Sequence, residues 1–446
     1  MKNMVNIVVC SVIMLSLSGM ARKACAQEVV VENDSGVGAR SMGMGGAQIA
    51  AVDDATAVIY NPAALARMKQ LEVQLGLNMM KRKVGTILKS TLKNSTVSAL
   101  TDYSGLGTVG LVYPVPTDRG SLVFGIGYNR VKDFAGRLEI NGYNDYLRGD
   151  QIGESIEEGG LGIYSLAGAV DVSPNISVGA SLDIWLGDYK RDNRNLINDV
   201  SETYSQLDIT GIDDDISAWS FKPAILYFKD KFRFGAYARL PMTFHIKEYN
   251  YSEGYSRTDG EYFKLYEIID PSSEFTDVDY TYSDRMSYKI KAPMQIGFGF
   301  SWGTPGRNCF ALDLIQENWT QAKIEYPRDY VQEPNYFRDK YRSALTWRVG
   351  VEKSLPFFNT VGRIGYMRNP LIFKGPRGYE NESPIISVKN ERDFITLGLG
   401  KQFDESLSMD IGYSHGFWSQ REAPRVDEES RNRVYVSLTY RMPTGL

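Results

Sequence analysis

The chain has 446 residues, with 54 Asp or Glu against 50 Lys or Arg, and a formal net charge of −4. This acidic balance argues against nucleic acid as a partner. Since the chain has only 3 cysteines and 2 histidines, most cysteine- and histidine-based metal sites are excluded, and we expect neither a metal nor a cofactor.

The first 26 residues have the pattern of a secretory signal peptide. Lys2 gives a positive start, residues 4–20 are mostly apolar, and Ala24-Cys25-Ala26 has the small-x-small form of a cleavage site. The apolar run is short and basic residues follow it closely, which argues against both a transmembrane anchor and a lipoprotein. We therefore expect cleavage before Gln27 and export. No later stretch approaches the roughly 18 apolar residues that a transmembrane helix needs.

From residue 70 onward the sequence alternates between apolar and polar residues, which is typical of β-strands. The last segment, 433–442, is a clear case, because every second residue from Val434 to Met442 is large and apolar. Such segments are as long as a tilted membrane crossing of about 9–11 residues, whereas strands of globular proteins are usually about 5–6 residues long. Their length favours a membrane barrel over a soluble sandwich.

The connections between these segments are of two kinds, which alternate along the chain. Short turns rich in Pro, Gly and Asn alternate with long polar loops, as in bacterial outer-membrane barrels. The pattern predicts an all-β, antiparallel transmembrane barrel of about fourteen strands, with both termini on the periplasmic, short-turn side. We expect strands near 71–80, 105–114, 120–132, 160–172, 175–187, 216–229, 231–246, 287–303, 307–319, 343–355, 359–367, 392–403, 406–415 and 432–442.

Charged residues inside these strands fall on the face that does not contact lipid. An Arg facing lipid at the midplane would cost about 2–4 kcal/mol, so a polar network in the lumen is expected. Its candidate members are Asp183, Arg233, Arg239, Asp313, Arg348 and Glu352. The basic members could instead hold the carboxylate of a ligand, although pairing with the acidic members is favoured. Aromatic residues near the strand ends predict two girdles at the membrane surfaces.

Residues 27–70 lack strand character and are interpreted as a plug, or hatch, inside the barrel of residues 71–446. Small residues dominate this segment and include Gly43, Gly45 and Gly46. Asn61 suits the N-cap of a short helix and Pro62 suits its first position. A flexible periplasmic leader is the alternative interpretation.

The same segment resembles a known family. Residues 38–47 (GARSMGMGGA), 53–57 (DDATA) and 60–65 (YNPAAL) look like the N-terminal signature of the FadL/TodX-type outer-membrane transporters. The resemblance implies a fourteen-stranded barrel plugged by an N-terminal hatch. It also implies passive uptake of long-chain fatty acids or aromatic hydrocarbons, with sideways release through a gap beside an inward-kinked strand. Gly125 and Gly127, on the third strand, are the candidates for that gap.

We expect a monomer that contacts outer-membrane lipid and lipopolysaccharide. A barrel that serves as a surface scaffold or secretion accessory, without transport, is the alternative function. An enzyme is disfavoured: Thr243 and His245 share a strand face but lie about 6.6 Å apart along it, and Ser414 and His415 face opposite sides.

Two outer loops have further candidate features. The run Asp213-Asp214-Asp215 could bind Ca²⁺, but a solvated loop tip is the favoured interpretation. The predicted loop 246–287 carries Tyr249, Tyr251, Tyr255, Tyr262, Tyr266, Tyr280 and Tyr282. It could fold over the barrel mouth, or could equally be an ordinary exposed loop.

Overall fold

A computed structural model describes residues 36–145, 149–199, 204–258, 280–327, 336–355, 359–370, 372, 386–388, 392–422 and 425–442. The expected signal peptide, together with Tyr262 and Tyr266, lies outside these residues. No helix in the described part of the chain is long and apolar enough to span a membrane.

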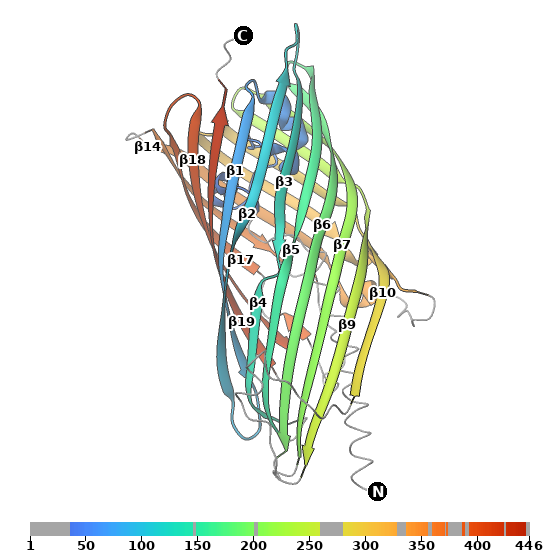
Figure 1. Cartoon of the computed structure of the whole chain (residues 1–446). Coiled ribbons are helices and arrows are strands. Elements are labelled where there is room, and N and C mark those ends of the chain that lie inside the picture. The colour runs from blue at the N-terminus through green and yellow to red at the C-terminus, as the bar shows by residue number, and fades with distance from the viewer. Residues whose placement is uncertain are drawn as a thin grey trace.

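The dominant element is one antiparallel sheet closed into a barrel of 14 strands, as the alternating pattern predicted (Figure 1). The barrel closes where the first strand pairs with the last, from Glu72 opposite Arg441 to Leu88 opposite Arg425. The strands are β1 (Glu72–Leu88), β2 (Ser95–Val115), β3 (Leu122–Asp133), β4 (Gly136–Asn144), β5 (Gly149–Ser173), β6 (Ile176–Asp199), β7 (Tyr204–Lys229), β8 (Phe232–Arg239), β9 (Met242–Thr258), β10 (Tyr280–Ala292), β11 (Gln295–Thr304), β12 (Asn308–Asn318), β13 (Lys323–Glu325), β14 (Ser343–Leu355), β15 (Thr360–Asn369), β16 (Ile386–Val388), β17 (Arg392–Gln402), β18 (Leu407–Glu422) and β19 (Arg425–Arg441).

Two of the barrel strands are each divided by a proline. Pro241 lies between β8 and β9, and Pro293 lies between β10 and β11. Proline has no backbone N–H to donate to the neighbouring strand, so it interrupts a ladder. The chain nevertheless continues across the wall: β8 pairs with β11, and β9 pairs with β10.

The strands are longer than the sequence predicted. Much of the predicted loops 187–217 and 246–287 is strand, because β6, β7, β9 and β10 continue into them. The prediction was wrong because beyond the membrane both faces of a strand meet water or polar neighbours. The hydrophobic alternation then fades, although the backbone ladder continues. Asp213, Asp214 and Asp215 therefore lie within β7 and not at a loop tip, and Asp214 is fully buried.

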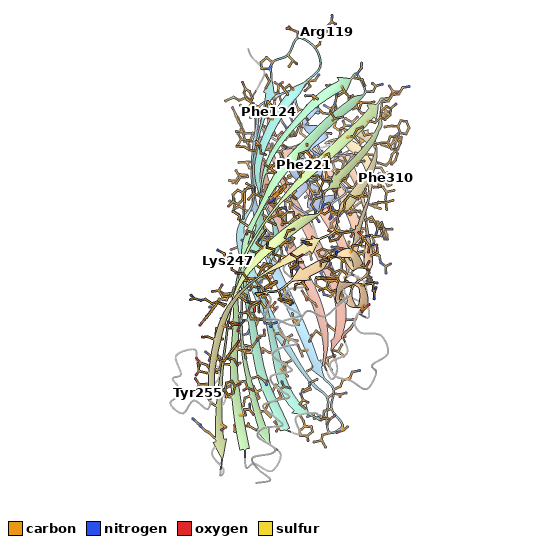
Figure 2. The ribbon with its side chains drawn as sticks, turned by 90° about the vertical axis from the view of Figure 1, so that its right-hand side faces the viewer. Arg119, Phe124, Phe221, Lys247, Tyr255 and Phe310 are labelled. Atoms are coloured by element: carbon orange, nitrogen blue, oxygen red, sulfur yellow. The ribbon has the colours of Figure 1, made fainter. Side chains whose placement is uncertain are left out.

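The outer face of the barrel carries a belt of exposed apolar side chains. Along β1, Val73, Leu75, Leu77 and Met79 are exposed while the residues between them face inward. Phe124 and Phe221 lie in the half nearer the short turns, and Tyr255 lies at the far, long-strand end (Figure 2). On β7 the belt ends at Trp219, since Ser217 and Asp215 follow on the same face. Residues of β7 before about 216 thus extend beyond the lipid.

Inside the barrel, nearer the short-turn end, lie residues 36–68, which we call the N-terminal segment (Figure 1). It contains α2 (Ala39–Gly43), α3 (Ala57–Tyr60) and the 3-10 helix η1 (Pro62–Arg67). α2 contacts β15, β17, β18 and β19, whereas η1 contacts β3, β5, β6 and β7. The segment therefore touches opposite parts of the wall, and most of its side chains are buried.

Local chemistry explains the course of this segment. The Asn61 side chain accepts a hydrogen bond from the Ala63 amide at 3.1 Å, and Pro62 begins η1, so the N-cap forms as the sequence indicates. Gly45 and Gly46 have positive φ angles of 62° and 77°. A Cβ on Gly45 would lie 2.7 Å from the Tyr366 backbone nitrogen, and one on Gly43 would lie 2.8 Å from Gly398 Cα. The glycines thus allow the segment to lie directly against the wall.

Candidate functional site: a chamber in the lumen

The half of the lumen beyond the N-terminal segment contains an apolar cluster, which we call the lumen cluster. It brings together inward-facing side chains from strands that are far apart in sequence. Its buried members are Val37, Val131, Phe134, Leu161, Ile163, Trp185, Tyr189, Ile212, Ile216, Ala218, Met242, Phe244, Ile246, Met286, Tyr288, Ile290, Ala292, Trp319, Ala322, Phe337, Tyr341, Ala344 and Ile372. The interior of a porin is polar and filled with water, whereas this part of the lumen holds a packed apolar cluster beside buried charged side chains.

Part of the cluster comes from the connection between β12 and β14. The helices η2 (Trp319–Gln321) and α5 (Tyr336–Lys340) contact each other, and Trp319, Phe337 and Tyr341 are buried. The Phe337 and Tyr341 rings lie 4.6 Å apart. The strands predicted near 307–319 and 343–355 leave 320–343 as a long polar loop, because three separated aromatic residues have no periodicity that distinguishes a buried loop from an exposed one.

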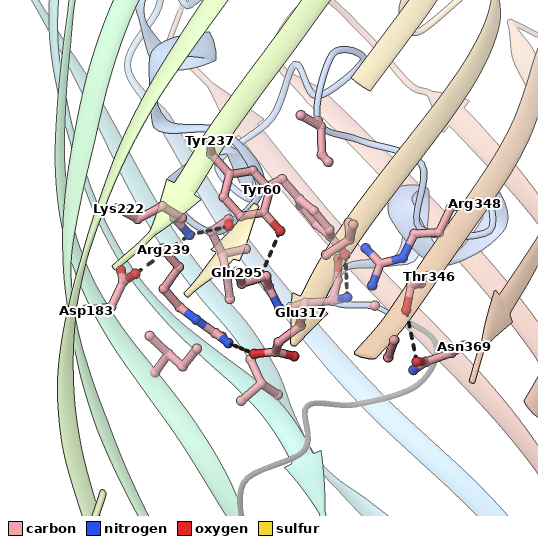
Figure 3. Close-up of a pocket in the computed structure, with 18 of the residues that line it drawn as sticks. Tyr60, Asp183, Lys222, Tyr237, Arg239, Gln295, Glu317, Thr346, Arg348 and Asn369 are labelled. Atoms are coloured by element: carbon pink, nitrogen blue, oxygen red, sulfur yellow. Dashed lines mark hydrogen bonds and ion pairs between the residues drawn. The ribbon is translucent and has the colours of Figure 1, made fainter. Parts of the chain in front are cut away.

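A cavity of about 100 Å³ lies between the lumen cluster and the N-terminal segment (Figure 3). This space is smaller than an engineered apolar cavity of about 150 Å³ that holds benzene, so a one-ring compound would need the lining side chains to move apart. The aliphatic and aromatic residues that line it are Val37, Ile49, Ile59, Tyr60, Val131, Ile163, Trp185, Tyr237, Ile315, Trp319 and Ile372. Its charged lining residues are Asp183, Lys222, Arg239, Glu317 and Arg348.

Two pairs of opposite charge lie on one side of the cavity. Lys222 Nζ lies 3.7 Å from Asp183 Oδ2 and also donates to the Ile59 carbonyl. Arg239 Nη2 lies 2.6 Å from Glu317 Oε1. The side chains of Ser165 and Ser181 also donate to Asp183. Asp183 was predicted as a member of the lumen network, but its partner Lys222 was not. Arg239 was also predicted, and its partner Glu317 is not among the six predicted residues.

Arg348 enters the cavity from the opposite side (Figure 3). Its Nη1 donates to the Gly46 carbonyl at 3.3 Å. Its cross-strand partner is Asp313, but Asp313 Oδ2 accepts the Gln48 and Ile49 amides at 2.6 and 2.9 Å. Within the described part of the chain, Arg348 makes no ion pair and its Nε has no hydrogen-bond partner.

The last two predicted network residues lie away from the cavity. Glu352 accepts from Arg40 of the N-terminal segment and from Arg363 of β15, and Arg363 also bonds Asp410. For Arg233, no ion pair forms among the residues that the structure describes. The six predicted residues all lie on or near the inner wall, but they do not bond one another.

The wall has a seam next to the lumen cluster. The β2–β3 ladder ends at Thr108 opposite Asn129, the β3–β5 ladder has a register shift between Arg130 and Lys132, and β4 then pairs with β5. β4 lies against β1 and β2, but no backbone ladder joins it to them in the described residues. Side chains hold the seam instead: Asn78 donates to Asp133 at 2.9 Å and Arg433 to the same carboxylate at 3.1 Å.

Gly125 and Gly127, the sequence-based candidates for a gap, lie in the part of β3 that pairs with both neighbours. They face the N-terminal segment: a Cβ on either would meet Val58, at 2.7 and 3.0 Å. The discontinuity of the same strand comes a few residues later, after Arg130. Val131, immediately beyond it, lines the cavity.

Trp185 and Tyr237 were also not selected from the sequence. In β6, Trp185 lies on the face that otherwise holds Ser181 and Asp183, so a bulky ring on a polar face was an available signal of a lumen contact.

His415, considered as a base, has its Nδ1 2.8 Å from Asn432 Oδ1. No group of three or more metal-ligating side chains occurs among the described residues.

A closed barrel with an apolar belt, an internal N-terminal segment and an apolar cluster in the lumen has the architecture of an outer-membrane transport protein. A family model described as outer membrane protein transport protein (OMPP1/FadL/TodX) matches residues 16–442, and the chain belongs to this family. A search of curated proteins finds no significant match.

Several solved structures have the same fold. The chain is 13% identical to the Pseudomonas putida toluene transporter TodX, with a TM-score of 0.60, covering 92% of this chain and 99% of that one. A Pseudomonas aeruginosa FadL homologue has 15% identity and a TM-score of 0.57, with 93% and 99% covered. The CymD monoaromatic hydrocarbon channel has 14% identity and a TM-score of 0.54, with 92% and 99% covered.

Proposed function

We propose that this protein admits small hydrophobic compounds passively through the outer membrane. The observation that carries the proposal is the lumen cluster, since an apolar lumen offers a favourable environment to an apolar solute. Burying apolar surface stabilises a solute by about 25 cal/mol per Å². The names of two structural relatives, a toluene transporter and a monoaromatic hydrocarbon channel, are consistent with it.

The path begins at the long-strand end, which we assign to the outside of the cell. A solute passes the aromatic side chains of η2 and α5, enters the lumen cluster and reaches the cavity. Val131 and Phe134 belong to the cluster and flank the seam. An exit at the seam leads sideways into lipid and spares an apolar solute a return to water.

The N-terminal segment acts in this scheme as a hatch, with Gly43, Gly45, Gly46, Asn61 and Pro62 giving its close fit to the wall. A lumen of about fourteen strands without a filling would leak water. The boundaries 27–70 for the hatch and 71–446 for the barrel, and a monomeric state in contact with lipid and lipopolysaccharide, belong to the same proposal.

Uptake by whole cells tests the function. Toluene and a long-chain fatty acid are supplied to the parent strain, a deletion strain and a complemented strain. Slower toluene uptake in the deletion strain, restored by the gene, is expected. Parental uptake rates for both compounds, together with loss of secreted proteins from the cell surface, would favour the scaffold function instead.

A further inference from the structure

The apolar belt on the outside of the barrel changes into a basic surface where β11 meets β10. Phe298 and Met294 are exposed on the β11 side. Beyond Pro293, the first exposed residues of β10 are Lys291 and Lys289, and the residues between them face inward. The outer face of this strand therefore passes from apolar to charged within a few residues.

The neighbouring strand changes in the same way. Leu240 is exposed directly after β8, and beyond Pro241 the exposed residues of β9 include His245 and Lys247. Figure 2 shows Lys247 between the belt and the far, long-strand end. Because β8 pairs with β11 and β9 pairs with β10, the two changes form one boundary on the outer surface.

This boundary lies at the edge of the lipid. Trp219 is the last exposed apolar residue on β7, and Ser217 lies two residues further out. Ser217 is opposite His245 of β9, and His245 is opposite Lys289 of β10. Tryptophan is enriched at the membrane–water interface, at the level of the headgroups. Lys289 therefore lies where the headgroups of the surrounding lipid begin.

Five basic side chains share this outer surface of β9, β10 and β13, and we call them the basic patch: Lys247, Arg285, Lys289, Lys291 and Lys323. At the same levels of β7, β9, β10 and β13, the outward-facing acidic residues are Asp213, Asp215 and Glu325. Five positive charges against three negative ones leave a net charge of +2. The whole chain has a net charge of −4, so the patch is a local excess of positive charge.

Most of the patch has no carboxylate partner. Lys291 Nζ lies 2.5 Å from Glu325 Oε1, but Lys247, Lys289 and Lys323 make no ion pair with any residue that the structure describes. Lys323 lies directly opposite Lys291 in the β10–β13 ladder, and like charges in opposite positions of a sheet destabilise it. An anion bound between these lysines would offset their repulsion.

The size of the patch indicates the kind of anion. Arg285 and Lys291 are six residues apart on β10, which corresponds to about 20 Å along the strand. The patch also crosses three strands that are each about 4.8 Å from the next. A single phosphate contacts only part of such an area. A headgroup that carries more than one phosphate on a sugar fits the area and the charge.

We propose that the basic patch binds the phosphorylated sugar headgroup of an outer-leaflet glycolipid, the lipid A part of lipopolysaccharide. The acyl chains of the same molecule then lie on the apolar belt, beside Leu240 and Met294. Lysine suits this boundary, because its ammonium bonds phosphate oxygens while its aliphatic stem stays on apolar surface. The inference goes beyond uptake and rests on one part of the proposed function, the assignment of the long-strand end to the cell surface.

Binding of defined lipids to the purified full-length protein in detergent tests the inference. Native mass spectrometry compares bisphosphorylated lipid A, the same lipid A after removal of its phosphates, and phosphatidylglycerol. We expect lipid A to bind about tenfold more tightly than either of the other two, because charge-assisted bonds to its phosphates are lost in one and fewer in the other. Inorganic phosphate, added as a soluble competitor, should not displace lipid A.

Paired substitutions locate the site. An exposed ionic contact contributes little by itself, so two lysines are changed together. Lys289→Gln with Lys323→Gln should raise the Kd for lipid A about tenfold, while heat-modifiable migration and toluene uptake stay unchanged. The matched control is Lys81→Gln with Lys83→Gln. Both lysines are exposed on β1, which pairs with β2 and β19 and lies outside the patch, so the control should leave the Kd unchanged.

Four results would overturn the inference and leave passive uptake standing. Equal binding of lipid A with and without its phosphates would show that the acyl chains alone bind. Equal binding of phosphatidylglycerol would show a general attraction to anionic lipid, and displacement by inorganic phosphate would show a site for free anions. An equal loss in the β1 control would show a general effect of charge. An antibody epitope inserted at Ser256 of β9 that stays hidden on intact cells would instead overturn the orientation and this inference together.

Discussion

Arg40 of the N-terminal segment forms a bidentate ion pair with Glu352 of the barrel wall. Arg40 Nη2 lies 2.9 Å from Glu352 Oε1, and Arg40 Nε lies 3.3 Å from Glu352 Oε2. Both side chains are almost completely buried, and Arg40 also pairs with Asp53. Arg363 bonds the same Glu352 carboxylate at 3.1 Å. This buried ion pair joins the N-terminal segment to β14 of the wall, although residues 40 and 352 are far apart in sequence.

Replacing Glu352 by Gln should loosen the N-terminal segment. Removing one partner of a buried ion pair costs about 3–5 kcal/mol, because the other charge stays buried. We expect faster entry of small polar solutes in liposome swelling and a lower urea midpoint, with the barrel still assembled. Lys81→Met is the control, since Lys81 and Asp102 form an exposed pair at 4.0 Å. Unchanged permeability in Glu352→Gln would contradict the role of this link.

Gly45 should tolerate no side chain. A Cβ there would lie 2.7 to 2.8 Å from backbone atoms of Tyr366 and Val349, and its φ is positive. Backbone strain of this kind costs about 1–3 kcal/mol, and the clash adds to it. Gly45→Leu is therefore expected to raise sensitivity to small polar antibiotics. Gly85→Ala is the control, because its Cβ would meet nothing closer than 3.7 Å. Equal sensitivity of the two variants would refute the close fit.

A covalent cross-link across the seam should stop the release of solute from the lumen into the membrane. Asn78 and Asp133 meet across it, with Nδ2 2.9 Å from Oδ2. Cysteines at both positions, in a Cys309→Ser background, can be bridged by a short thiol cross-linker and released by a reductant. Toluene uptake is expected to fall on bridging and to recover on reduction. The single-cysteine variants control for the reagent. Full uptake by the bridged protein would place the exit elsewhere.

Asp214 should make stability depend on pH. It lies beyond the lipid belt, and burial, followed by the nearby Glu248, Asp213 and Asp215, raises its pKa from 3.8 to about 8, with Arg191 opposing. The folded protein therefore keeps a proton that the unfolded chain loses near pH 4. The free energy of unfolding should fall as pH rises from about 4 to 8, by about 1.4 kcal/mol for each unit of pKa shift at most.

Urea unfolding across this pH range, followed by tryptophan fluorescence, measures the effect. Asp214→Asn should flatten the profile and stabilise the protein at pH 8. Asp102→Asn is the control, since its carboxylate is exposed and is not among the groups that shift the pKa of Asp214. Identical pH profiles for the wild type and Asp214→Asn would show that the aspartate does not titrate in this range.

Tags report the orientation of the barrel. An epitope inserted at Ser256, near the end of β9, should bind antibody on intact cells, because we assign the long-strand end to the cell surface. An epitope at Pro305, in the turn between β11 and β12, should bind only after permeabilisation. Reversed labelling would invert the assignment.

The sequence determined the barrel by itself, because alternation along a strand is a local property that lipid on one face imposes. Val73, Leu75 and Leu77 face lipid, and Gln74 faces the lumen, as their order requires. The N-cap at Asn61 was equally local, whereas the close approach of Gly45 to Tyr366 and Val349 depends on the folded barrel. The family signature in residues 38–65 added the expectation of a transport protein, which the family model then established.

The tertiary structure alone decided which inner residues meet. Arg348 and Asp313 are cross-strand partners, yet Asp313 is occupied by backbone amides of Gln48 and Ile49, more than 260 residues away in sequence. Pairing across a lumen depends on the closure of the barrel and on the path of the segment inside it, and neither leaves a periodic trace in the sequence. For the same reason Lys222, Trp319 and the break in β3 after Arg130 appear only in the folded chain.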